Sequence, residues 1–102
     1  MRKEKIEMYA ESVGKMASRH LDTAIYELKR GFFTDAIMSF GAAWMCYQIL
    51  FVRFGDKAHF WMPDGYMERS KWFQTMVDEI MERNRMQTSV DEVVNDKPLE
   101  VE

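Results

Sequence analysis

The sequence KRGFFTD at residues 29–35 separates two long helical patterns and decides the fold. Its basic pair places positive charge at a helix C-terminus, where it offsets the helix dipole. Gly31 follows at the position where a left-handed glycine commonly ends a helix. Thr34 or Asp35 can then cap the next helix by accepting from its free N–H groups. So short a connection predicts that the two helices run antiparallel.

Apolar residues recur at steps of three and four on both sides of this turn and again near the C-terminal end. The patterns predict three long helices, at about 4–30, 35–54 and 66–87. Shorter helical segments are expected at 57–62 and after Ser89, where Glu92 completes a capping box. We therefore expect an all-α fold, an antiparallel helical bundle of three long helices plus short helical segments, in one domain of 102 residues.

Charge is unevenly distributed along the chain, whose net charge is −3. Residues 88–102 form an acidic C-terminal segment that carries five acids and one lysine, a net −4, which leaves +1 for residues 1–87. A nearly neutral body offers no bulk attraction to nucleic acid or to an anionic membrane. The single cysteine and the lack of a basic and apolar leader at residue 1 favour a cytoplasmic protein.

The second predicted helix is apolar on nearly every side, because only Ser39 and Gln48 have polar side chains between Ala36 and Val52. This length lies at the lower limit of about 17 residues for a membrane span. We favour a core helix of a soluble bundle, since the amphipathic helices on both sides need an apolar partner and Gln48 would be costly in lipid.

Two amphipathic helices can cover only part of such a helix, so a second copy of the chain is expected to cover the rest. Small residues on one side permit close approach of another helix, and larger apolar residues extend the opposite side. The expected homodimer interface comprises Met38, Gly41, Ala42, Met45, Ile49 and Val52. The aromatic residues Phe60 and Trp61 offer a further contact for a second copy or a partner protein.

Most catalytic and ligand-binding patterns are missing from the sequence. His20, Cys46 and His59 are too far apart for a usual metal motif, and no glycine-rich phosphate loop is present. Cys46 lies within the most apolar helix, where burial makes a thiol inert. We expect neither a metal nor a cofactor.

One pair of residues is a candidate catalytic pair. Arg53 and His59 are separated by five residues across the end of the second helix. Histidine can move a proton of a ribose 2′-hydroxyl or of a leaving oxygen, and arginine can stabilise the charge on the phosphate. The structural alternative is an arginine at a helix end beside a histidine at the start of the next segment.

The order of features from residue 17 to residue 59 resembles the HEPN superfamily of small helical bundles. Spaced alanines and leucines precede a glycine turn with aromatics, and a helix that opens on alanine and is rich in aromatics leads to a glycine and a histidine. These features are Ala17, Leu21, Ala24, Leu28, Gly31, Phe32, Phe33, Ala36, Phe40, Ala43, Tyr47, Gly55 and His59. A similar glycine-hinged hairpin also occurs in an archaeal family of uncharacterised helical proteins.

The resemblance implies one of two functions. Many HEPN proteins are dimeric ribonucleases with an Arg-x(4 to 6)-His motif, and others are binding modules or partners of a nucleotidyltransferase. Arg53 and His59 fit the spacing, but the family motif usually comes later, where this chain has Arg83 and Asn84 without the histidine. We therefore expect a non-catalytic dimeric interaction module in which Arg83 and Asn84 are candidates for nucleic-acid contact. The alternative is a metal-independent, toxin-like endoribonuclease that uses Arg53 and His59.

Overall fold

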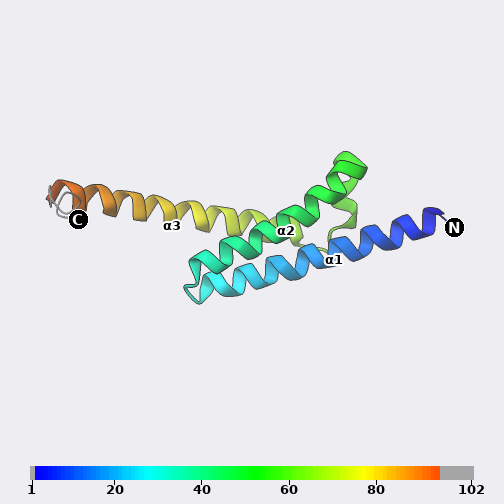
Figure 1. The fold of residues 1–102 in the computed structure, drawn as a ribbon, viewed down its shortest axis with the longest axis horizontal. Coiled ribbons are helices and arrows are strands. Elements are labelled where there is room, and N and C mark those ends of the chain that lie inside the picture. The colour runs from blue at the N-terminus through cyan, green and yellow to red at the C-terminus, as the bar shows by residue number, and fades with distance from the viewer. Residues whose placement is uncertain (1, 95–102) are drawn as a thin grey trace. The chain divides into compact units, whose positions relative to one another are not determined.

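A computed structural model describes residues 2–94 of the protein, with the side chains of residues 5–85. This part of the chain is all-α and contains no strand, which confirms the expected fold class. Its elements in chain order are α1 (Arg2–Lys29), α2 (Phe33–Phe54), the 3-10 helix η1 (Gly55–Trp61) and α3 (Tyr66–Val94) (Figure 1). The chain divides into two compact units, Met1–Ser70 and Lys71–Glu102, which are described separately below. The single domain expected from the chain length stays a prediction.

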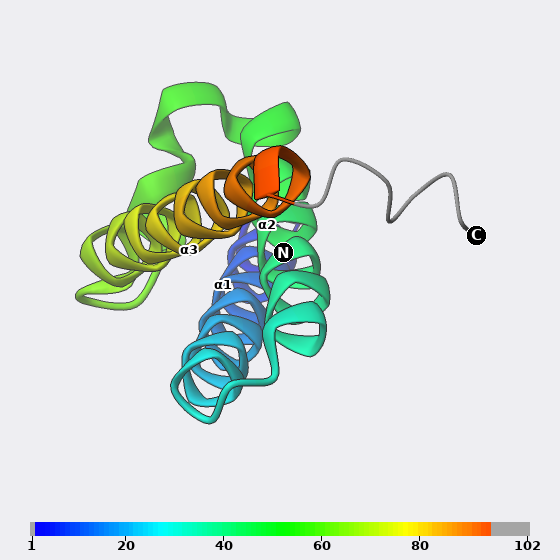
Figure 2. The same ribbon diagram turned by 90° about the vertical axis from the view of Figure 1, so that its left-hand side faces the viewer.

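In the first unit, α1 and α2 form an antiparallel hairpin, and they lie side by side in both views (Figures 1 and 2). Small and apolar residues at steps of three, four and seven are buried on the facing sides of the two helices. They are Ala10, Val13, Ala17, Leu21 and Ala24 in α1 and Ala36, Ala43, Cys46 and Leu50 in α2. Alanine at so many of these positions allows the helix backbones to approach closely.

Gly31 forms the turn of the hairpin with a positive φ of 88°, as the sequence predicts. The N–H of Phe32 donates to the carbonyl of Glu27 at 2.9 Å, and the N–H of Gly31 donates to that of Leu28 at 3.1 Å. These two bonds make a Schellman motif, which satisfies carbonyls left free at the end of α1.

The predicted cap of α2 is wrong. The helix already begins at Phe33, its N-cap is Phe32, and no side chain caps it. Thr34 and Asp35 therefore lie inside the first turn of α2. The physical reason is the Schellman turn, which leads the chain from Gly31 into the helix with only one intervening residue.

The short helix predicted at 57–62 is present as η1, which begins two residues earlier at Gly55, a glycine with positive φ. Its position depends on Gly14 in α1. A Cβ added at Gly14 would lie 2.0 Å from the carbonyl oxygen of Trp61, far below van der Waals contact. The missing side chain at Gly14 therefore lets the end of η1 rest directly on α1.

Side chains just after η1 fix the end of the first unit to the hairpin. The buried Tyr66 hydroxyl donates to the carbonyl of Ala43 at 3.4 Å. Arg69 forms an ion pair with Asp22 and donates to the hydroxyl of Ser18 at 3.1 Å. These bonds hold the first turn of α3 against both α1 and α2 within this unit.

The second unit consists of the continuation of α3, which runs beyond the predicted end near residue 87 to Val94. The expectation of a separate segment capped by Ser89 is wrong, because Ser89 lies inside the continuous helix. No glycine or proline interrupts the sequence between Gly65 and Pro98, so the helix has no local reason to stop at residue 87. The rest of the predicted acidic C-terminal segment, residues 95–102, lies outside the described residues.

Candidate functional site

The helix α2 has one buried side and one exposed side, although both are apolar. Ala36, Ala43, Cys46 and Leu50 are buried. On the opposite side, large apolar side chains are exposed to solvent: Met38 by 69%, Met45 by 61% and Val52 by 83%. An apolar patch of this kind on a small protein is typical of an interaction site.

The exposed side includes the interface predicted from the sequence. We name as the outer face the six residues Met38, Gly41, Ala42, Met45, Ile49 and Val52. Five of them are exposed and Ala42 is half-buried. Met38, Met45 and Val52 follow one another at intervals of seven residues, which places them in a single row along the helix.

A notch interrupts the outer face at Gly41. A Cβ added at this glycine would meet nothing within 4 Å, so the space above its backbone is open. Glycine in the middle of a helix costs about 1 kcal/mol relative to alanine. The neighbouring Ala42 extends the notch, which gives another helix a place for a large side chain.

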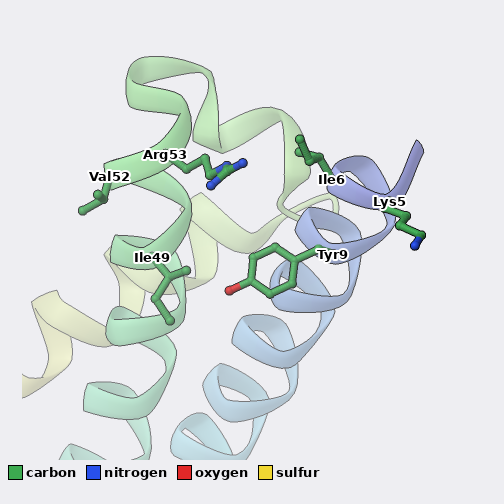
Figure 3. Close-up of a pocket in the computed structure, with 6 residues that line it drawn as sticks. All are labelled: Lys5, Ile6, Tyr9, Ile49, Val52 and Arg53. Carbon is green, nitrogen blue, oxygen red and sulfur yellow. The ribbon is translucent and has the colours of Figure 1, made fainter. Parts of the chain in front are cut away.

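A hollow of about 720 Å³ adjoins the outer face where α2 ends and α1 begins (Figure 3). Its lining is Lys5, Ile6 and Tyr9 from α1 and Ile49, Val52 and Arg53 from α2. Figure 3 shows Arg53 extending toward α1 and the hydroxyl of Tyr9 pointing toward α2. The walls are mainly apolar, Arg53 brings a positive charge between the two helices, and Lys5 points away from α2 in Figure 3. This lining suits an apolar occupant that brings a negative charge to Arg53.

The α1 side of this hollow was not predicted from the sequence. Ile6 and Tyr9 belong to the apolar stripe that was expected to face the core, but Tyr9 is 53% exposed and Ile6 is half-buried.

The candidate catalytic pair lies at the surface of the first unit. Arg53 lines the hollow and has no ion pair or hydrogen bond within the described part of the chain, whereas His59 is an exposed residue of η1 outside the hollow. The Nδ1–H of His59 donates to the carbonyl of Asp56 at 2.5 Å. The centroids of the His59 and Phe60 rings are 4.3 Å apart. A catalytic role of the two residues stays a prediction.

The candidate nucleic-acid residues Arg83 and Asn84 are exposed on α3 in the second unit. Asn84 lines a shallow hollow of about 620 Å³ together with Asp78, Met81, Glu82 and Arg85. Arg85 donates to Glu82 at 2.5 Å, so its charge is already partnered. Carboxylates around the hollow oppose the approach of a phosphate, and nucleic-acid contact here stays a prediction.

Cys46 is buried in the first unit, and burial raises the pKa of its thiol. The protonated thiol is a poor nucleophile. Within the described residues, no group of three or more His, Cys, Asp and Glu side chains is arranged to hold a metal ion.

By length and composition alone, one described segment, Phe33–Trp61, is apolar enough to cross a membrane. Its mean hydropathy is 1.3, and only 22% of its most apolar window is buried. The core helix of a soluble protein passes the same test of composition, but it is mostly buried. A helix that is so apolar and so little buried within its own fold is a candidate contact surface.

Comparisons of the chain with protein-family models, with curated proteins and with solved structures find no match.

Proposed function

We propose that the protein is a dimeric, non-catalytic helical interaction module and that the outer face of α2 is its interface with a second copy. The observation that carries this proposal is the exposure of the outer face, where Val52 is 83% and Met38 69% exposed. Transfer of one large apolar side chain from water into an apolar contact is worth about 1.5–3 kcal/mol. A row of three such residues provides a substantial driving force for association.

The proposed interface involves one helix from each copy, which lies at the small end of stable interfaces. We therefore expect a reversible dimer whose population depends on concentration. Assignment to the HEPN-like type, a cytoplasmic location and association with a nucleotidyltransferase or nucleic-acid system belong to the same proposal. The HEPN-like type and the association rest on the sequence resemblance described above, and the location rests on the single cysteine.

A pair of matched substitutions tests the proposal. Met45 on the outer face and Met8 on α1 are exposed to similar extents, 61% and 67%. Met45→Glu places a charge inside the proposed interface and should leave the protein monomeric at concentrations where the unchanged chain is a dimer. Met8→Glu should dimerise normally. Circular dichroism should give the same helix content for both variants, and equal dimerisation of both would contradict the proposal.

Incubation of the pure protein with mixed RNA and a chelator separates this function from that of a ribonuclease. The proposal predicts intact RNA. Cleavage that disappears in His59→Ala would instead establish the metal-independent endoribonuclease and assign proton transfer to His59.

A further inference from the structure

We infer that the two copies meet through antiparallel α2 helices, related by a two-fold axis that passes close to Met45. This inference rests on the proposed function and adds the orientation, the register and the residue pairs of the interface. With the axis at Met45, a residue of one copy lies opposite a residue of the other copy when the two residue numbers add up to 90. Met38 is then opposite Val52, and Gln48 is opposite Ala42.

The charges at the two ends of α2 favour this orientation. Asp35 lies in the first turn and Arg53 in the last turn. The two residues are 18 positions apart, about five turns of 3.6 residues, so they lie on the same side of the helix. Both are exposed, and neither has an ion pair within the described part of the chain.

A parallel pair of helices would bring like charges together at each end. The antiparallel register instead brings Asp35 of each copy near Arg53 of the other, with an axial offset of two residues, or about 3 Å. Complementary charges at the rim of an interface set its register and suppress the wrong orientation. Two equivalent ion pairs would therefore flank the apolar row.

The shape of the outer face fits the same register. Gln48 and Ile49 are the larger side chains opposite the notch at Gly41 and Ala42 of the other copy. The open space above Gly41 can accept them. In a parallel pair the two notches would face each other and leave a void, which costs contact energy.

The hollow at the end of α2 fits the same register. Ile49, Val52 and Arg53 line it, and the register places Met38 and Asp35 of the second copy beside these residues. Met38 would contact the apolar walls, and the carboxylate of Asp35 would lie beside the positive charge of Arg53. The segment of the second copy from Asp35 to Met38 thus provides both the negative charge and the apolar side chain that suit the hollow.

Cysteine cross-linking tests the orientation in a Cys46→Ser background. Met38→Cys and Val52→Cys proteins are oxidised separately and as a mixture. In the antiparallel dimer the two Met38 positions are separated by 14 residues along the axis, about 21 Å, which exceeds the reach of a disulfide. We expect the mixture to form a disulfide-linked dimer that contains one chain of each kind, with little linkage in either separate sample.

Charge reversal tests the residue pairs. Asp35→Arg and Arg53→Asp should each weaken the dimer about tenfold, because each creates two like-charge contacts. The double variant should restore most of the lost affinity, because the pairs re-form with exchanged partners. Additive losses in the double variant would overturn the proposed pairs.

The outcomes separate this inference from the proposed function. A dimer in which Met38→Cys links to itself would overturn the antiparallel orientation and leave the dimeric module intact. A chain that stays monomeric in sedimentation overturns both proposals. If such a monomer floated with phosphatidylcholine vesicles, the outer face would be assigned to a lipid surface.

Discussion

At the scale of single residues, Gly14 has the clearest structural requirement. A Cβ at this position would lie 2.0 Å from the carbonyl oxygen and 3.0 Å from the carbonyl carbon of Trp61. These are backbone atoms, so a rotamer change cannot relieve the clash. We predict that Gly14→Ala destabilises the protein by about 2 kcal/mol, in spite of the better helix propensity of alanine. Urea unfolding followed by circular dichroism measures this loss.

Gly41 is the matched control, since it is also a glycine inside a long helix. A Cβ there meets nothing within 4 Å, so Gly41→Ala should stabilise the folded chain by up to about 1 kcal/mol. Both variants are compared with the unchanged chain at a concentration where all are monomers. Equal effects of the two substitutions would contradict the close approach of η1 to α1.

Tyr66 should make the stability of the protein sensitive to alkaline pH. Burial is the main cause that raises the pKa of Tyr66 from 10.0 to about 12, and the side chain is only 3% exposed. The folded chain therefore retains the phenol proton that the unfolded chain loses. Its stabilising contribution is complete below about pH 10 and is lost as the pH rises toward 12.

The expected slope is a fall of about 1.4 kcal/mol in the free energy of unfolding per pH unit within that window. Urea unfolding at several pH values between about 9 and 11.5 measures it. Tyr66→Phe has no phenol to ionise and should show a shallower decline. The same slope in both proteins would show that other groups cause the pH dependence.

At the scale of elements, the hairpin turn depends on the left-handed conformation of Gly31. Its φ is 88°, and a Cβ there would meet no atom within 4 Å, so the cost of a side chain is purely conformational. We predict that Gly31→Ala lowers the free energy of unfolding by about 1 kcal/mol. Gly31→Asn should lower it less, because asparagine tolerates this conformation better. Thermal unfolding of the three proteins ranks them, and equal stability would contradict the role of the turn.

The sequence predicted the hairpin well because local rules govern it. Periodic apolar residues define the helices, and Gly31 ends α1 without help from distant residues. The start of α2 was misjudged because the turn uses backbone hydrogen bonds where side-chain caps at Thr34 or Asp35 were expected. The end of α3 was misjudged because a capping-box pattern at Ser89 also occurs within continuous helices.

The candidate site was only partly predictable. A helix that is apolar all round must have an uncovered side in a small bundle, which is why Met38, Met45 and Val52 were anticipated. The hollow was not anticipated, because it depends on how far the ends of α1 and α2 separate. Periodicity places Tyr9 on the apolar stripe, but only the packed structure shows that it is half exposed.

At the scale of the whole molecule, the central claim is that a second copy covers the outer face of α2. The folded chain leaves this row of large apolar residues in water along one side of α2. Such a surface is costly for a monomer and typical of a subunit interface. The claim predicts how the molecular mass depends on concentration, so it can be tested without any knowledge of a ligand or a substrate.

Sedimentation equilibrium of the unmodified chain over a range of concentrations is the most direct test. We predict a mass that rises from one chain to two as the concentration increases, with Met45→Glu remaining at one chain throughout. A mass of one chain for the unmodified protein at concentrations on the order of tens of micromolar, with ordinary stability, would contradict the claim.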